Sequence, residues 1–96
     1  MEIKKEINGE QAVMALNGWL DTKSAPEFEA KLSSLPTDVT SLTLDLAELE
    51  YISSAGLRQV VAAHKKMSGN LTIINVSDEI KELFRMAGFD KKLNIQ

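Results

Sequence analysis

Apolar residues divide this chain into short segments with two different spacings, one typical of strands and one typical of helices. Two apolar-containing runs, MEIKKEI and QAVMALNG, flank Asn8-Gly9, a pair typical of a tight β-hairpin turn. Asn17-Gly18 and Asp21 then indicate another turn. LTIINV, which is rich in β-branched residues, and LNI predict two later strands. The run SLTLDL predicts a strand with one strongly apolar face, formed by Leu42, Leu44 and Leu46.

The first helix is predicted in TKSAPEFEAKLSSL. Ser24 is a candidate N-cap, and Glu27 stands three residues later, as in a capping box. Pro26 suits the first turn of a helix, whereas Pro36 should end it. The apolar residues expected near one face are Ala25, Phe28, Leu32 and Leu35.

Two further helices are predicted in the second half of the chain. One begins near Ser53–Ser54 and runs towards Ser68, where Gly69-Asn70 stops it. The other is capped by Ser77 and ends at Gly88, and its apolar residues follow the spacing i, i+3, i+4, i+7. The apolar faces are Leu57, Val60, Val61, His64 and Met67 in the first, and Ile80, Leu83, Phe84 and Ala87 in the second.

The predicted order of elements is β-β-α-β-α-β-α-β, in which strands and helices alternate after the hairpin. Alternation of this kind predicts an α/β fold with parallel crossovers. We therefore expect one domain over residues 1–96, with a small mixed sheet and about three helices. Ligand and partner sites in such sheets gather beyond the carboxyl ends of strands. The segment YISSAGLR lies at such an end, so it is a candidate functional loop.

Composition narrows the class of protein. The chain has 96 residues, of which 44% are hydrophobic and 26% charged, as expected of a soluble globular domain. It has no cysteine, so no disulfide or thiolate site is possible. Its net charge is −3 and its basic residues are scattered, which gives no footprint for nucleic acid. No apolar run approaches the roughly 20 residues that span a bilayer. The start MEIKKEINGE has no apolar segment typical of a secretory signal, and we expect a cytoplasmic protein.

The candidate chemistry argues against an enzyme. Ser54 could act as a nucleophile only with a base nearby, and the one histidine, His64, lies about 15 Å further along the same predicted helix. One histidine and no cysteine argue against a metal site, and the chain has no glycine-rich phosphate loop. We expect no cofactor and no metal. Two interpretations of Ser53 and Ser54 stay open, a helix cap and a target for modification.

Four stretches of this chain together resemble the STAS domain family, and in particular the bacterial anti-sigma factor antagonists. NGWLDTKSAPEFEAKL is similar to the family's G-x-L-D-x-x-x-A segment. LTLDLAELEYISSAGLRQVV is similar to its central strand, loop and helix, where Asp-Ser-Ser/Thr-Gly-Leu is usual. GNLTIINVS resembles the following strand, and IKELFRMAGFDKKLNI resembles the last helix with its Leu-Phe-x-x-x-Gly ending. Family members often carry another helix beyond this point, and a face that it would cover is expected to be open here.

The resemblance implies a switch based on phosphorylation. In the family, a loop serine is phosphorylated by a partner that is both anti-sigma factor and serine kinase, and a phosphatase reverses the step. Alignment on Gly56-Leu57 places that serine at Ser54, with Ser53 as runner-up because it replaces the usual aspartate. Trp19 would belong to an interface if exposed and to the core if buried. The residues expected to bind the partner are Asp21, Thr22, Ser24, Ser53, Ser54, Ala55, Gly56 and Leu57.

Structural roles compete with these assignments, since Leu57 could pack in the core and the residues around Ser24 could cap a helix. We expect a monomer or a weak dimer, without nucleic acid or membrane insertion. One alternative function is an accessory subunit of a bacterial lipid-transport ABC system, which binds the ATPase without a phosphorylation cycle. Another is a STAS protein in a larger signalling assembly unrelated to sigma factors.

Overall fold

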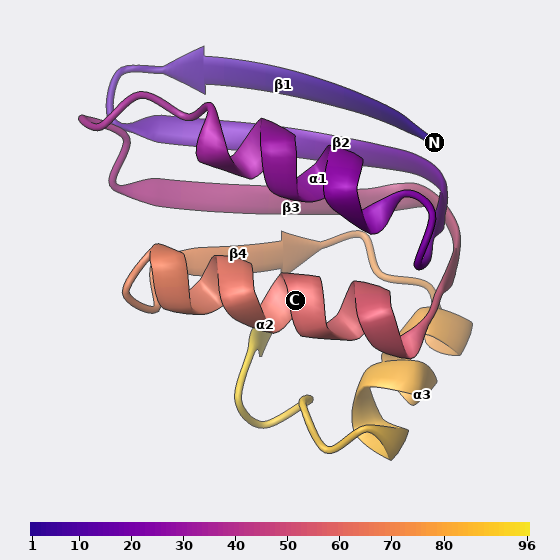
Figure 1. Cartoon of the computed structure of the whole chain (residues 1–96). Helices are drawn as coiled ribbons and strands as arrows, with labels where there is room; N and C mark the ends of the chain where they lie inside the picture. The colour runs from indigo at the N-terminus through magenta and orange to yellow at the C-terminus, as the bar shows by residue number, and fades with distance from the viewer.

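The strands and helices follow the predicted order in a computed structural model that describes all residues 1–96 (Figure 1). The hairpin and the alternating βα units are confirmed. The elements are β1 (Glu2–Asn8), β2 (Gln11–Leu20), α1 (Ala25–Ser33), β3 (Ser41–Ile52), α2 (Ser54–Lys66), β4 (Leu71–Ile74), α3 (Asp78–Met86) and β5 (Asn94–Ile95).

The five strands form one sheet in which spatial order equals chain order, β1-β2-β3-β4-β5. β1 pairs with β2 in antiparallel fashion, and every later pair is parallel. Each parallel connection moves one strand further in the same direction, so right-handed crossovers place the connecting helices on one face. Figure 1 shows α1 and α2 lying over that face. The carboxyl ends of β2 and β3 therefore meet at one edge of the sheet.

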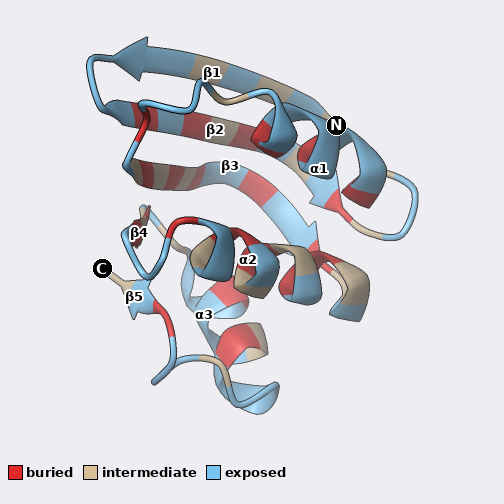
Figure 2. Cartoon of the chain, turned by 60° about the vertical axis from the view of Figure 1, so that its left-hand side comes forward, coloured by how far each residue is buried: buried red, intermediate tan, exposed pale blue.

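The core lies between the helices and one face of the sheet. The three leucines of SLTLDL are all buried, which confirms the predicted apolar face of this strand. Ile80 and Phe84 of α3 belong to the same buried cluster as the strand residues. In Figure 2 the buried parts of α1 and α2 lie on the sides that turn towards the sheet. The largest fully buried side chains are Phe28, Phe84, Met14, Leu16, Leu20, Leu42, Leu44, Leu46, Ile52, Leu71, Ile73 and Ile80.

The turn predicted from Asn17-Gly18 and Asp21 is confirmed at residues 21–24 but not at Asn17-Gly18, because β2 continues through that pair to Leu20. Gly18 has φ of 106°, a conformation that glycine adopts without strain. The pairing of β2 with β3 shifts register on both sides of this residue, between Ala15 and Asn17 and between Gly18 and Trp19. The glycine therefore accommodates an irregularity inside a long strand.

Strand β3 is twice as long as the predicted SLTLDL, since it continues to Ile52. Beyond Leu46 its buried residues are Leu49 and Ile52, spaced by three. The register shifts cause this spacing, so the second half of the strand lacks the strict alternation of apolar and polar residues that predicts a strand.

The helices are slightly shorter than predicted. α1 covers Ala25–Ser33 of the predicted stretch 22–35 and ends before Pro36 as expected, and α2 ends at Lys66 rather than near Ser68. Val61 and His64 are only partly buried, and Ala87 lies just beyond α3 and is exposed. No helix is long and apolar enough to cross a membrane.

Candidate functional site

The candidate partner-binding residues are brought together at the carboxyl edge of β2 and β3. Leu20 and Ile52 are partners in the β2–β3 register, so the segments that follow them start side by side. The backbone N–H of Ser53 donates to the carbonyl oxygen of Leu20 at 2.9 Å, which joins the start of α2 to the end of β2. The loop 21–24 and the start of α2 therefore form one continuous surface segment.

Ser53 and Ser54 have different roles at the start of α2. Ser53 is the N-cap, with extended backbone, and its Oγ accepts a hydrogen bond from the N–H of Gly56 at 3.3 Å. Its carbonyl oxygen accepts from the N–H of Leu57 at 2.8 Å. Ser54 is the first helical residue, is exposed, and its hydroxyl makes no hydrogen bond within the chain. The two interpretations left open by the sequence thus fall on different serines, because Ser53 is the cap and Ser54 is the accessible hydroxyl.

The cap can be tested by alanine substitution. Ser53→Ala is expected to destabilise the protein by about 1 kcal/mol, because the N–H of Gly56 loses its acceptor. Ser54→Ala is expected to change the free energy of unfolding by less than about 0.5 kcal/mol, since its hydroxyl has no partner. Thermal and urea unfolding of both variants gives the comparison, and equal losses would contradict the division of roles.

Gly56 and Leu57 lie beneath the surface. Gly56 is buried, and a Cβ atom there would lie 2.4 Å from the carbonyl oxygen of Leu20 and 2.8 Å from Cγ1 of Ile52. Leu57 is only 7% exposed and belongs to the core cluster. The burial of Leu57 agrees with its packing alternative, and its expected role in partner binding stays a prediction. Both residues fix the approach of α2 to the sheet and thereby position Ser54.

The loop 21–24 is held by its own hydrogen bonds. Oδ1 of Asp21 accepts from the N–H groups of Lys23 and Ser24 at 3.0 and 3.1 Å. Oγ of Ser24 donates to the carbonyl oxygen of Trp19 at 2.6 Å and accepts from the N–H of Asp21 at 2.9 Å. Because this hydroxyl is engaged outside α1, it gives the helix no side-chain cap. The predicted capping box of Ser24 is therefore wrong. Thr22, in the middle of this loop, is exposed.

Hydrogen bonding to the loop holds the pKa of the Asp21 carboxyl below its ordinary value, with the backbone N–H of Ser24 as the main cause. A carboxyl with a lowered pKa in the folded state stabilises the fold above its unfolded pKa, and this stabilisation is lost as pH falls through the folded value. Asp21→Asn is therefore expected to lower Tm near pH 7. Melting curves between pH 7 and pH 2.5 should show the difference from the parent shrinking in acid. A difference that grows in acid would contradict this prediction.

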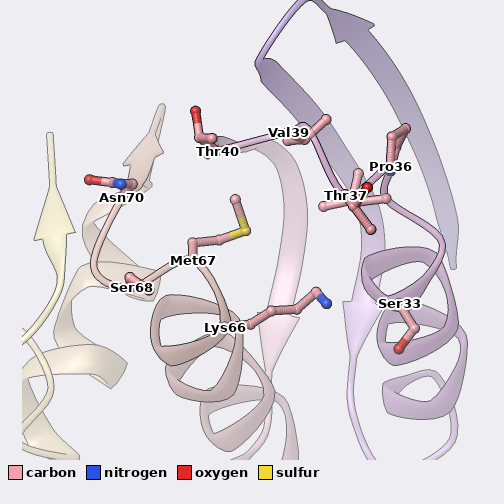
Figure 3. A pocket seen from close by; sticks show the side chains of 10 residues that line it. Ser33, Pro36, Thr37, Val39, Thr40, Lys66, Met67, Ser68 and Asn70 are labelled. Atoms are coloured by element: carbon pink, nitrogen blue, oxygen red, sulfur yellow. The ribbon is translucent and has the colours of Figure 1, made fainter.

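The geometry provides no base for Ser54. His64 lies in the last turn of α2, at the other end of the helix from Ser54. No three histidine, cysteine or carboxylate side chains are grouped closely enough to hold a metal ion. A cleft of about 490 Å³ lies at the opposite edge of the sheet, between the ends of α1 and α2, and Lys66 is its one ionisable lining residue (Figure 3). The arrangement leaves the hydroxyl of Ser54 accessible at the start of α2.

One feature of this edge depends on strand pairing and was missed in the sequence. Trp19 is 56% exposed and lies beside Tyr51, which is 41% exposed, with ring centroids 5.3 Å apart. The exposure of Trp19 agrees with its interface alternative. Tyr51 attracted no prediction because its neighbour across the sheet is set by the register shifts of β2 and β3.

The fold and the site together define a small α/β domain with a serine exposed at a helix start. Residues 3–95 match the family model described as Mlab, STAS domain, and the chain belongs to the STAS domain family. It is 32% identical over 81 residues to BtrV of Bordetella bronchiseptica, which is named as an anti-sigma factor antagonist, covering 80% of this chain and 70% of that protein. It is 30% identical, over an alignment of 98 positions with gaps counted, to the anti-sigma-B factor antagonist of Bacillus subtilis, and the alignment covers 99% of this chain and 88% of that protein.

The solved structures confirm the fold. The Bacillus cell fate determinant SpoIIAA in its phosphorylated form superposes with a TM-score of 0.75 at 21% identity, over 99% of this chain and 91% of that chain. The mixed sheet with helices crossing between parallel strands is therefore an arrangement that this chain shares with an experimentally determined STAS fold.

Proposed function

We propose that this protein is an anti-sigma factor antagonist whose binding is controlled by phosphorylation of Ser54. In its unmodified form it binds an anti-sigma factor that is also a serine kinase, and the sigma factor is released. Phosphorylation of Ser54 ends the interaction, and a serine phosphatase restores it. One observation carries this proposal: of the two adjacent serines, only Ser54 presents a free and exposed hydroxyl.

The relatives support the proposal at two levels. Two of them, each at least 30% identical to this chain, bear the name of anti-sigma factor antagonists. A protein of the same fold has been solved in a phosphorylated form. The resemblance, aligned on Gly56-Leu57, implies that Ser54 corresponds to the family's modified serine, and Ser54 is also the accessible one. The sequence and the geometry favour the same residue.

The proposed partner surface has an exposed layer and a supporting layer. Thr22 and Ser54 are exposed, and Ala55 is half-buried beside them. Asp21, Ser24 and Ser53 shape the backbone between these residues through hydrogen bonds. Gly56 and Leu57 are buried and hold α2 against the sheet. In this proposal the last five residues act on binding through the shape of the surface.

The start of α2 can accept a phosphate without unfolding. Its first turn has no acidic residue, in contrast to α1 and α3. A phosphate adds about 1.5–2 negative charges, which the free N–H groups and the dipole of a helix N-terminus favour. Arg58, exposed one turn further along, adds a positive charge on the i+4 position. The modification therefore changes the surface presented to the partner and leaves the core unchanged.

The proposal is tested by mass spectrometry of the protein isolated from its native cells during growth and under stress. A single phosphate on Ser54 that changes with the condition is expected. In vitro, the cognate kinase should phosphorylate the parent and the Ser53→Ala variant but not Ser54→Ala. Phosphate on Ser53 alone, or none in any condition, would overturn the assignment.

A second candidate is an accessory subunit of a lipid-transport ABC system, which binds an ATPase without a phosphorylation cycle. The observation that favours it is Ser53, which stands where the antagonists usually have an aspartate and which serves here as a helix cap. Purification from native cells distinguishes the two functions. An ATPase that remains bound to Ser54→Ala and to parent protein alike, with no phosphate on Ser54, would favour this second candidate.

A further inference from the structure

Trp19 and Tyr51 form an exposed aromatic pair on the sheet face that turns away from the helices. They are partners in the β2–β3 register, and the residues that follow them, Leu20 and Ile52, are buried. Since neighbouring residues of a strand point to opposite faces, the two rings lie on the outer face. Their interplanar angle is 52° and neither ring belongs to the core cluster. A tryptophan that is more than half exposed beside a second ring is typical of a recognition surface.

Carboxylates outnumber ammonium groups on the surface beside this pair, even with the α-amino group of Met1, which lies against Gly18, counted among the latter. Glu48 and Glu2 are both register partners of Asn17. Glu50 is the extra residue of β3 between the pairs Gly18–Leu49 and Trp19–Tyr51, and at this irregularity Glu50 and Tyr51 are both exposed between the buried Leu49 and Ile52. All three glutamates are exposed, and none forms an ion pair, since the only salt bridge joins Arg85 and Glu82. A hollow of about 190 Å³ opens on this face where the register shifts. Its lining residues are Glu2, Lys4, Ala15, Leu16, Asn17, Asp45, Ala47 and Glu48, with three carboxylates against one ammonium group.

From this juxtaposition we propose that the outer face at the carboxyl edge binds an arginine side chain presented by a protein partner. An arginine side chain can interact with both the aromatic pair and the neighbouring carboxylates. Its planar guanidinium stacks on the face of tryptophan or tyrosine, and its N–H groups pair with carboxylates in a two-pronged geometry. A lysine ammonium offers neither the plane nor the fork. The surplus of carboxylates supplies the charge complementarity.

The aromatic pair and Ser54 lie at the same end of the sheet. Oγ of Ser24 donates to the carbonyl oxygen of Trp19, and the N–H of Ser53 donates to the carbonyl oxygen of Leu20. The loop 21–24 and the start of α2 are thus tied to the strand end that carries Trp19, and we expect one partner to reach both. The inference rests on the proposed function in one respect, that a protein partner covers this edge of the sheet.

Peptide titration of the intact protein tests the inference without a sigma factor, a kinase or a phosphate. The probes are acetyl-Gly-Arg-Gly-Arg-Gly-amide and its lysine counterpart, at low ionic strength. Trp19 is the only tryptophan, so its indole N–H gives a single resonance in a ¹H–¹⁵N spectrum. The arginine peptide is expected to shift this resonance saturably and to bind at least about fivefold more tightly than the lysine peptide.

Three variants complete the experiment. Glu48→Gln and Tyr51→Ala are each expected to weaken binding of the arginine peptide about threefold or more. Glu48→Gln preserves the shape of the side chain, so a folding defect of Tyr51→Ala does not decide the outcome. Met86→Ala, at an apolar side chain that is 71% exposed on α3, is the control and should bind like the parent.

Either of two results would overturn the inference. One is an indole resonance that does not shift with the arginine peptide, that shifts to the same extent with the lysine peptide, or that shifts to the same extent in Glu48→Gln as in the parent. The other is an indole resonance that changes on dilution without peptide, which would assign the face to a second copy of the chain. Failure of Ser54 phosphorylation in cells leaves this titration unaffected, so the failures of the two proposals can be told apart.

Discussion

Phosphorylation of Ser54 is expected to weaken binding of the anti-sigma factor more than a hundredfold, while the fold stays intact. The hydroxyl is exposed at the first residue of α2, so a phosphate there would lie on the partner surface. Burying a dianion against a closely packed partner opposes binding through desolvation and steric fit. A loss of about 3 kcal/mol corresponds to a factor above 100 in Kd, enough to switch partners.

Calorimetric titration of the anti-sigma factor measures this effect, with phosphoserine incorporated at position 54. The matched control carries phosphoserine in place of Thr37, an exposed residue of the cleft at the opposite edge of the sheet. The control adds the same charge to the chain and should bind within about twofold of the parent, since exposed charges far from an interface are largely screened. Equal weakening by both phosphates would show that net charge, and not the position of Ser54, controls binding.

Gly56→Ala is expected to cause a larger loss of stability than alanine at any of the other four glycines, because only at Gly56 would the new Cβ lie within 3.0 Å of other atoms. The new Cβ would lie 2.4 Å from the carbonyl oxygen of Leu20, and a backbone atom of a central strand cannot move away cheaply. The whole start of α2 would have to shift from the sheet. Overpacking of this kind costs about 3 kcal/mol. For a domain of this size, such a loss lowers Tm by roughly 12–24 °C.

The control for Gly56→Ala is Gly9→Asn in the β1–β2 turn. Gly9 has φ of 64°, a Cβ atom added there would have no heavy atom within 4 Å, and asparagine tolerates this conformation. Its Tm is expected to change by only a few degrees. If Gly56→Ala melted within about 2 °C of the parent, the close approach of α2 to Leu20 would not be a constraint on the fold.

The order of elements and the location of the site could be predicted because both depend on local signals. The hairpin follows from Asn8-Gly9, and the start of α2 follows from two serines between an apolar strand and an amphipathic run. The predicted order of elements puts Ser54 and its neighbours at the carboxyl end of a parallel strand, and the structure has them at the end of β3.

The features that could not be predicted depend on pairing between strands. The register shifts set which residues of β3 are buried after Leu46, so its second half escaped detection. The same shifts place Tyr51 beside Trp19. Ser24 fits the pattern of a capping box, but its hydroxyl donates to the carbonyl oxygen of Trp19 instead. Helix-capping preferences along the chain do not include such a bond to the end of a strand. The burial of Leu57 follows from how closely Gly56 lets α2 approach the sheet.

The sequential strand order has a consequence for how the chain reaches this structure. Every strand pairs with the strand that precedes it, so no partner has to wait for a distant segment of the chain. The β1–β2 hairpin closes a short loop and loses little entropy, whereas the parallel pairs join residues about 30 positions apart, such as Ala12 and Leu42, and are expected to form later. During synthesis the β1–β2 hairpin emerges first, and each βα unit can add its strand to the growing edge. We therefore expect a nascent chain released after β4 to hold a protected hairpin, with β5 as the last strand to close the sheet.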